Sequence, residues 1–421
     1  MVMLNALFIK PLQQKLFAKE ANVRSVKATG HADDNLPDLV NVKTNGAKGD
    51  GLTDDTEAIK DAIAVAKANG IATVYFPEGH YMIGGAGTKP GIIKLANGVS
   101  LIGDGPAKTH IVLSGGRFNP VSIFYQEWRE EPSVDNITIQ GIDFDGNLSK
   151  QTFEAKYQFC HALSINNGKN IEVKNCKFQS FRGDGLLFGD TFEASLNARM
   201  VLNVKVHHCE FVDIYREGTM FCAVNGAAFY NNWVHGNGYL VGGVDIERHS
   251  ANETVLNVAV HDNTFDFRDG YGPIERGRIL KYRRAITIGY FYDGYQNGAA
   301  DSLSGHHKIY NNTIYQGQID CFGHLNVTIT RNTIINNFEN LKGVLHVSTP
   351  AINVSDARNT TGLENVVIDS NYIRSSIPGN GIVFYKYKKV TARHNILKGR
   401  NLGDVMLINS EGAVNSNITK K

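Results

Sequence analysis

Short strings of alternating apolar and polar residues recur along much of this chain. Each combines an alternating strand, a polar corner and a further apolar residue, and the four clearest copies cover residues 203–211, 257–265, 326–334 and 365–373. Weaker copies begin at Asp135, Asn170, Gly226, His306 and Lys389. Alternation with a period of two predicts a strand with one buried face, and its recurrence every few tens of residues predicts a solenoid or a similar array.

The spacing of the copies indicates which kind of solenoid this is. The seventh residue of each copy marks the corner, and successive corners lie between 20 and 49 residues apart. A helical repeat keeps its period more tightly, whereas a parallel β-helix accepts insertions at one place in each coil. We therefore predict an all-β fold, a single-stranded right-handed parallel β-helix. Six successive corners are asparagines that we expect to adopt the left-handed conformation and to hydrogen-bond from coil to coil, namely Asn232, Asn263, Asn312, Asn332, Asn371 and Asn395.

The N-terminal part follows other patterns. Residues 1–37 hold a mildly amphipathic stretch and a polar linker, which predict an arm. Residues 38–95 predict a capping segment, in which helix-starting residues at 53–55 precede an amphipathic run and residues 74–83 form a strand pair around a turn. The β-helix itself is expected to span 96–421, with its largest insertion at 266–305.

The capping segment carries two motifs that resemble a known family. Residues 46–59 read G-A-K-G-D-G-L-T-D-D-T-E-A-I, and residues 74–81 read V-Y-F-P-E-G-H-Y. Both are similar to the N-terminal signature of the pectate-lyase superfamily of right-handed β-helices, which includes phage tailspike depolymerases and polysaccharide lyases. The resemblance implies a cap whose aspartates are structural and a polysaccharide substrate. It implies a homotrimer for phage members and a monomer for secreted ones.

Composition narrows the setting. The net charge of +2 gives no sign of a nucleic-acid partner, and no apolar run approaches the ~20 residues of a membrane span. Residues 1–9 are apolar but lack the flanks of a secretory signal. From the resemblance we expect an extracellular protein or part of a phage virion. Cys176 and Cys209 occupy equivalent corners, and we expect two buried thiols there rather than a disulfide.

Two pairs of carboxylates are candidates for catalysis. Aligning the third strand of successive coils on Gly185, Gly218 and Gly243 places Asp184 beside Glu217. In the strand after Gly243, the apolar neighbours must point into the core, so Asp245 and Glu247 point outward.

The predicted separations suggest acid/base chemistry. Cα atoms two residues apart on one strand are ~6.6 Å apart, comparable with the ~6.5–9.5 Å between the carboxyl groups of inverting glycosidases. Asp184 and Glu217, one coil apart, would lie ~5 Å from each other, nearer to the retaining arrangement. Solvated acids that only aid solubility are the alternative for both pairs.

Basic and aromatic residues cluster in and around the largest insertion. Arginine forks bind carboxylates and aromatic faces stack on sugar rings, so this composition favours an acidic polysaccharide. The alternative is a long loop that uses these side chains to pack against the barrel. The candidate substrate-binding residues are Arg248, His249, Arg276, Arg278, Lys281, Tyr282, Arg284, Tyr290 and Tyr292.

Three functions remain open at this point. We favour a depolymerase that hydrolyses an acidic or capsule-type polysaccharide through a carboxylate pair. The second is a lyase or C5-epimerase that removes a proton from a uronic-acid unit, with Arg248, Lys281, Tyr282 or Arg284 as base or neutralising group. The third is a non-catalytic, glycan-binding tail fibre. Apart from Ca2+ held by strand carboxylates in the second case, no cofactor or metal is expected. The chain lacks the Asp-Pro-His run of alginate epimerases and the Gly-His-Gly motif of polygalacturonases.

Overall fold

The computed structural model describes residues 39–84, 91–116, 122–126, 133–151, 160–189, 200–236, 242–249, 253–268, 274–275, 278–279, 283–290, 303–337, 350–355, 363–376, 379–399 and 402–420. Only the backbone is described at 274–275, 278–279, 283 and 290. The predicted arm at residues 1–37 lies outside these ranges.

Three parallel sheets make up the fold. Sheet 1 contains β1 (Val40–Asn41), β3 (Thr73–Phe76), β6 (Ser100–Gly103), β9 (Val134–Gln140), β12 (Gly168–Lys174), β15 (Val201–His207), β18 (Val224–Tyr230), β21 (Val255–His261), β26 (Ser304–Gly305), β27 (Lys308–Tyr310), β30 (Val327–Thr330), β33 (Val366–Asp369), β36 (Val390–Arg393) and β39 (Gly412–Asn415). Sheet 2 contains β2 (Asp50–Asp54), β4 (Gly79–Ile83), β7 (Thr109–Leu113), β10 (Asp143–Asp145), β13 (Lys177–Gln179), β16 (Glu210–Val212), β19 (Trp233–His235), β22 (Thr264–Asp266), β28 (Thr313–Tyr315), β31 (Thr333–Asn336), β34 (Tyr372–Ser375), β37 (Ile396–Lys398) and β40 (Ile418–Lys420). Sheet 3 contains β5 (Gly91–Lys94), β8 (Ser122–Gln126), β11 (Leu163–Ile165), β14 (Leu186–Phe188), β17 (Glu217–Phe221), β20 (Gly242–Arg248), β25 (Arg283–Tyr290), β29 (Gly317–Phe322), β32 (Ile352–Ser355), β35 (Gly379–Tyr385) and β38 (Leu402–Ile408).

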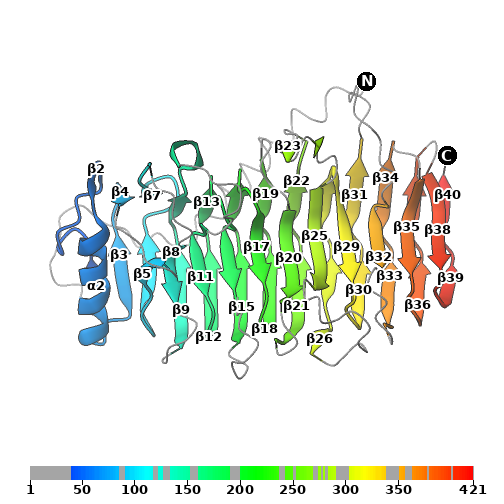
Figure 1. Ribbon diagram of the computed structural model, residues 1–421, viewed down its shortest axis with the longest axis horizontal. Coiled ribbons are helices and arrows are strands. Elements are labelled where there is room, and N and C mark those ends of the chain that lie inside the picture. The colour runs from blue at the N-terminus through cyan, green and yellow to red at the C-terminus, as the bar shows by residue number, and fades with distance from the viewer. Residues whose placement is uncertain are drawn as a thin grey trace. The chain divides into compact units, whose positions relative to one another are not determined.

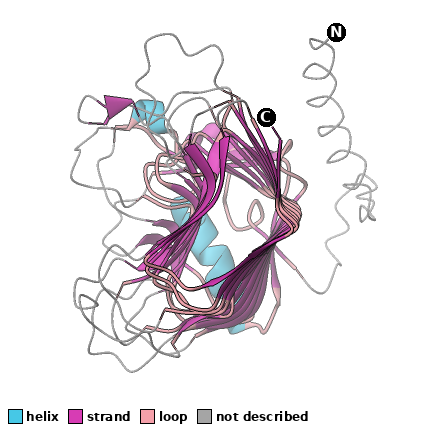
Figure 2. Ribbon diagram, turned by 90° about the vertical axis from the view of Figure 1, so that its right-hand side faces the viewer, coloured by secondary structure: helices cyan, strands magenta, loops and turns pink. Residues whose placement is uncertain are grey.

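The chain visits the sheets in a fixed cycle. One coil runs through β15, β16 and β17, and the next begins with β18, which pairs in parallel with β15. Repetition of this cycle stacks the strands from the N-terminal to the C-terminal end, as the colour gradient in Figure 1 shows. Viewed along the stack, the three sheets enclose one core (Figure 2). The predicted parallel β-helix is confirmed. Besides these strands, the described residues form one α-helix, a short 3-10 helix (Leu148–Lys150) and an antiparallel pair, β23 (Ile274–Glu275) and β24 (Arg278–Ile279).

Alternating apolar residues fill that core. In β15, Val204 and Val206 are buried while Lys205 between them is exposed. Equivalent positions of successive coils lie one above the other, so like side chains stack. Phe178 stacks on Phe144 and on Phe211, with ring centroids 5.2 and 5.0 Å apart. Each such aromatic pair contributes about 0.5–1.5 kcal/mol beyond simple burial.

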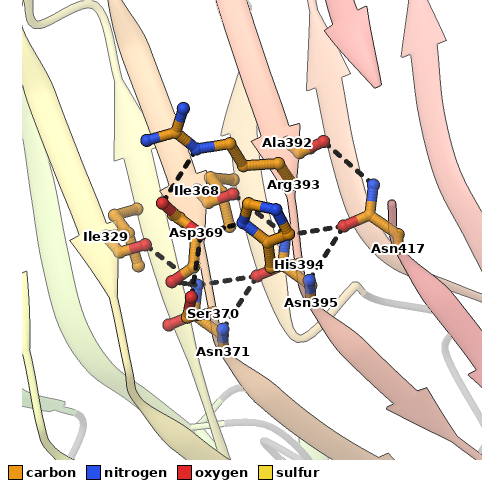
Figure 3. Close-up of polar contacts among 10 residues, drawn as sticks. All are labelled: Ile329, Ile368, Asp369, Ser370, Asn371, Ala392, Arg393, His394, Asn395 and Asn417. Carbon is orange, nitrogen blue, oxygen red and sulfur yellow. Dashed lines mark hydrogen bonds and ion pairs between the residues drawn. The ribbon is translucent and has the colours of Figure 1, made fainter. Parts of the chain in front are cut away.

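The corner between sheets 1 and 2 has constant length. From β12 to β40, two residues separate the two strands, and the second is the ladder position. In the asparagine ladder, for example, Asn332 Oδ1 accepts the backbone N–H and Nδ2 of Asn312, and Asn332 donates onward to Asn371. The ladder continues through Asn395 to Asn417 (Figure 3). The predicted stacking of amides is confirmed.

The left-handed residue is not the one expected. It precedes the ladder position, as at Asn231, Arg331 and His394, with φ of 53°, 54° and 54°. The ladder side chain must point inward to bond its neighbours, whereas the bend falls on the preceding residue, whose side chain points outward and is free to vary. The equivalent corners at Cys176 and Cys209 carry free, buried thiols, as predicted.

Insertions occur at two places in the coil rather than one. Residues 237–241 and 338–349 separate strands of sheet 2 from strands of sheet 3, while 190–199 and 356–362 separate sheet 3 from sheet 1. Both places flank sheet 3, because the corner between sheets 1 and 2 is occupied by the buried ladder and does not change length. Sheet 3 is therefore the sheet whose two borders vary from coil to coil.

An amphipathic helix, α2 (Thr56–Ala68), lies at the N-terminal end of the stack (Figure 1). It buries Ile59, Ala62 and Ile63 among other residues. Asp55 does not cap it with its side chain but accepts the N–H groups of Lys48 and Gly49, at 2.6 and 3.0 Å. The aspartates of the motif thus have the structural role that was expected. β3 and β4, predicted as a strand pair, join different sheets instead.

No helix among the described residues combines the length and apolar character required to cross a bilayer.

Candidate functional site

The outer face of sheet 3 gathers residues that are far apart in the sequence. Met220 lies opposite Asp245, and this row of residues continues through Thr287 to Asp320. Glu217 starts a neighbouring row, which runs through Gly242 and Arg284 to Gln318. The register predicted from the glycines is therefore confirmed.

The glycines hold this register for a steric reason. A Cβ at Gly243 would run into the ring of Phe265 in the core, and one at Gly242 would overlap the Glu217 carboxyl group. Gly242 thus provides the space on the outer face in which the Glu217 side chain lies. Replacing Gly242 would force that carboxyl group to move.

The side chains of β20 alternate between the core and the outer face from Val244 to Arg248, as expected. Val244 and Ile246 are fully buried in the core, so Asp245 and Glu247 belong to the outer face. Arg248, predicted to bind substrate, is on the inward side with no exposed surface, and its Nη1 donates to Ser304 Oγ at 3.2 Å. The same alternation that turns Glu247 outward turns Arg248 inward, away from the candidate site.

Glu217 is a buried acid at the centre of this face. It is 8% exposed, and its Oε2 has no hydrogen-bond partner. Burial and the negative charge of Asp184 raise the pKa of Glu217 to about 8. The carboxyl group is therefore protonated at neutral pH.

Asp184 is fully buried and supports Glu217 from the previous coil. Its Oδ1 accepts the backbone N–H of Glu217 at 3.1 Å and lies 3.6 Å from Arg216 Nε. His161 Nδ1 accepts the backbone N–H of Asp184 at 2.9 Å. Burial alone would raise the pKa of Asp184, but the charge of Arg216 and the hydrogen bond from the backbone N–H of Glu217 outweigh it and hold that pKa below its usual value. At neutral pH Asp184 is therefore ionised, whereas Glu217 is protonated.

Arg216 carries positive charge into this cluster. Burial opposes its charge, yet the carboxyl groups of Asp184, Glu217 and Asp245 raise the pKa of Arg216. Its side chain keeps 21% exposure, so the guanidinium remains open to the outer face. Sequence analysis missed this residue, and only the register of the coils places it among the acids.

Asp245 is a second acid that resists ionisation. Burial and the negative charge of Glu247 raise the pKa of Asp245 well above its usual value. Its Oδ1 has no hydrogen-bond partner. Glu247 has a partner, because its Oε2 lies 3.0 Å from His249 Nε2. His249 is anchored in turn by its backbone N–H, which donates to Glu253 at 2.5 Å.

The remaining candidates divide into three groups. Arg284 lies on this face, 52% exposed and 3.2 Å from Asp320. Only the backbone is described for Arg278 and Tyr290, whose strands are β24 and β25. Arg276, Lys281, Tyr282 and Tyr292 lie outside the described residues.

Buried polar atoms without partners concentrate on this sheet. Such atoms are rare in native proteins and mark strain, catalysis or an absent ligand. Those on strands of sheet 3 belong to Glu217, Thr219, Asp245, Gln318 and Asp320. Among the described side chains, no group of three or more His, Cys, Asp or Glu residues is placed to hold a metal ion.

The fold and this face define a class of protein. Residues 39–264, more than half of the chain, match the family described as "Rhamnogalacturonase A/epimerase, pectate lyase-like". The chain belongs to this family of right-handed β-helices.

Individual relatives share part of the chain. Mannuronan C5-epimerase AlgE1 of Azotobacter vinelandii is 29% identical over 204 residues, which cover 47% of this chain and 14% of that protein. Alginate lyase 7 of the same organism is 30% identical over 199 residues, covering 47% and 22%. Plasmin and fibronectin-binding protein A of Streptococcus pneumoniae is 31% identical over 164 residues, covering 35% and 22%. The chain thus spans less than a quarter of each of these relatives.

Solved structures extend the likeness in fold. The A-module of mannuronan C-5 epimerase AlgE6 from A. vinelandii aligns with a TM-score of 0.64 at 18% identity, covering 90% of this chain and 99% of the module. The tailspike protein of E. coli bacteriophage HK620 aligns with a TM-score of 0.67 at 16% identity, covering 98% and 73%. At such identities the likeness establishes the fold alone.

Proposed function

We propose that the protein modifies an acidic, uronate-containing polysaccharide on the outer face of sheet 3. The observation that carries this proposal is the cationic Arg216 beside two buried carboxyl groups, Glu217 and Asp245, that resist ionisation. A sugar carboxylate placed there would pair with the guanidinium and accept hydrogen bonds from the protonated acids. A face of ionised acids would instead repel such a substrate.

The reaction that fits best removes the proton on the carbon next to the sugar carboxylate. Neutralising that carboxylate makes the neighbouring proton more acidic, and donors already in place stabilise the anion that forms. His249, held by Glu247 at 3.0 Å, is the described residue suited to take the proton near neutral pH. Glu217 is suited to return one. Return to the opposite face yields a C5 epimer, and loss of the neighbouring glycosidic oxygen yields an unsaturated end.

The relatives support this reaction over hydrolysis. Their names include a mannuronan C5-epimerase and an alginate lyase, both of which act on uronans. The chain spans only part of each relative, so their activity is proposed for this chain and is not transferred to it.

Hydrolysis is the second candidate, and one observation favours it. The site pairs a protonated acid, Glu217, with an ionised one, Asp184, which is the division of labour a glycosidase needs. Against it, Asp184 is fully buried and bonded to its neighbours, so it is poorly placed to activate water.

One experiment separates the candidates. The protein is incubated with mannuronan, other uronans and bacterial capsules in D2O. Deuterium at C5 without chain cleavage indicates epimerisation, and ultraviolet absorbance from unsaturated ends indicates elimination. New reducing ends without unsaturation indicate hydrolysis, and binding without any product indicates a glycan-binding fibre. We expect solvent deuterium or unsaturation, so either of the last two results contradicts the proposal.

Two variants tie the activity to the site. Glu217→Gln should lower kcat by about a hundredfold or more, since a general acid contributes that much, and Asp245→Ala should also lower kcat because it removes a hydrogen-bond donor to the sugar carboxylate. Glu172→Gln, on the outer face of sheet 1, is the matched control and should leave turnover unchanged. Full turnover by Glu217→Gln would remove the assignment.

A further inference from the structure

A second polar cluster lies on the outer face of sheet 3, farther along the stack. It consists of Arg284 on β25 with Gln318 and Asp320 on β29. Asp245 is opposite Thr287, and Thr287 is opposite Asp320. Two strand spacings therefore separate Asp245 from Asp320, about 10 Å. That distance places Gln318 and Asp320 next to the reacting groups but not among them, while Arg284 lies on the strand between.

Its hydrogen bonds are unevenly distributed. Gln318 Nε2 donates to Asp320 Oδ2 at 2.5 Å, and Arg284 Nε lies 3.2 Å from the same oxygen. Both donors converge on Oδ2, and a side-chain hydrogen bond from Asn353, opposite Asp320 on β32, also reaches this carboxyl group. The other acceptors, Asp320 Oδ1 and Gln318 Oε1, have no partner, although Asp320 is 1% exposed and Gln318 8%. A buried acceptor left unpaired destabilises the fold, so these two oxygens lack donors that a ligand would supply.

Arg284 adds the charge that identifies the ligand. Its side chain is 52% exposed and lies over the ring of Phe322, 5.6 Å from the centroid. The cluster thus offers two acceptors for hydroxyl groups and one accessible cation for an anionic group. A sugar ring that bears hydroxyls and a carboxylate matches both demands.

The two coils before Asp245 present apolar side chains in the same row. In the row that contains Asp245, the two preceding coils contribute Leu187 and Met220, which are 4% and 1% exposed. These apolar side chains have no hydrogen bonds to give a sugar. Among the described side chains of this row, the polar groups nearest to Asp245 therefore lie toward the C-terminal coils, at Thr287 and Asp320.

We infer that Arg284, Gln318 and Asp320 form a binding subsite for a second uronate unit of the polysaccharide, next to the unit that reacts. The inference rests on the proposed function, and it adds a direction: the bound chain extends from Glu217 and Asp245 toward the C-terminal end of the stack. The subsite positions substrate and takes no part in proton transfer.

Binding to an inactive protein tests the subsite. In a Glu217→Gln background, calorimetry measures the affinity for uronate oligosaccharides of increasing length. We expect a step of about tenfold in Kd at the length that first reaches the subsite, since one set of hydrogen bonds to charged groups supplies that much. Adding Asp320→Asn or Arg284→Gln should abolish the step while leaving the affinity of shorter oligosaccharides unchanged.

Controls keep the two proposals apart. Arg331→Gln removes an exposed cation from the corner between sheets 1 and 2 and should preserve the step. Arg284 is half exposed, so its variant should keep the wild-type Tm even if Asp320→Asn disturbs folding. If no uronate oligosaccharide binds at any length, the proposed function fails. If oligosaccharides bind but the step persists in both subsite variants, the subsite alone is wrong.

Kinetics supplies a second readout. In the otherwise wild-type protein, Arg284→Gln should raise KM for long chains about tenfold and leave kcat unchanged. The reason is that the lost contacts stabilise the bound substrate and the transition state equally. A fall in kcat at unchanged KM would overturn the assignment of Arg284 to binding.

Discussion

Asp184 offers the sharpest test of how this site is tuned. It is fully buried and ionised, and its charge is one cause of the high pKa of Glu217. Asp184→Asn keeps the shape of the side chain and its acceptor for the Glu217 N–H, which is 3.1 Å away, but removes the charge. Arg216 would then lose one of its anionic partners and act more strongly on Glu217. Both changes favour ionised Glu217.

The size of the effect follows from the coil spacing. Neighbouring strands are ~4.8 Å apart, and two unit charges about 5 Å apart interact with about 3 kcal/mol at an effective dielectric constant of about 20. Since one pKa unit corresponds to about 1.4 kcal/mol, the upper limit is a shift of about two units. Residual screening reduces it, so we expect the pKa of Glu217 to fall from about 8 by about one to two units.

The assay is the pH dependence of kcat/KM on the uronan that the protein modifies. If Glu217 must be protonated, activity in the wild type declines above about pH 8. In Asp184→Asn the decline should begin about one to two pH units lower, whereas Glu172→Gln should leave it in place. Titration of 13C-labelled Glu217 by NMR reports the same shift without any need for turnover.

Two results would refute this reasoning. An alkaline limb that stays in place while Tm falls would make Asp184 a purely structural residue. A Glu217 carboxyl signal that titrates near its ordinary value in the wild type would remove the electrostatic argument altogether.

Other predictions concern stability. Glu217→Gln should gain stability relative to the wild type as pH rises from about 5 to 8, by up to ~1.4 kcal/mol per pH unit. The reason is that the folded wild type holds a proton on Glu217 that the unfolded chain has lost. The same pH dependence of the unfolding free energy in both proteins, measured with urea, would contradict this. Asn332→Ala should lower the free energy of unfolding by about 3 kcal/mol or more, because it strands buried donors and acceptors on both sides of the ladder, while Asn365→Gly at an exposed left-handed position should cost under about 1 kcal/mol. His307 is fully buried, and burial holds its pKa well below the usual value, so the wild type should lose stability as pH falls below about 6.5. His307→Gln should reduce this dependence of the unfolding free energy on pH. An unchanged dependence would mean that other groups cause it.

The ladder and the cap show how much the repeat alone determines. A strand of alternating residues followed by a polar corner can bury its apolar side only by stacking on another copy, so period and composition suffice to predict the β-helix and the asparagine column. The cap motif is local in the same way, since Asp55 bonds residues only six and seven positions away. The outward direction of Asp245 and Glu247 also followed from alternation along one strand.

Other features depend on neighbours that are distant in the sequence. Which corner residue is left-handed depended on the ladder amide pointing inward, a requirement set by the adjacent coils. Arg216 gave no signal as a functional residue, because its importance arises from acids on three different coils. Arg248 is of a residue type that often binds ligands, but it shares the inward side of β20 with Val244 and Ile246, and its partner Ser304 lies 56 residues away in the sequence.

The sequence by itself determined the period, and hence the fold, the ladder and the stripe of outward acids, because these depend on contacts between like positions of neighbouring copies. The tertiary structure decided which acids hold a proton and where a sugar chain would lie. The pKa of each acid depends on its burial and on the charges of all the groups that stacking brings near it. Because insertions of unequal length separate the copies, the sequence alone does not show which groups those are.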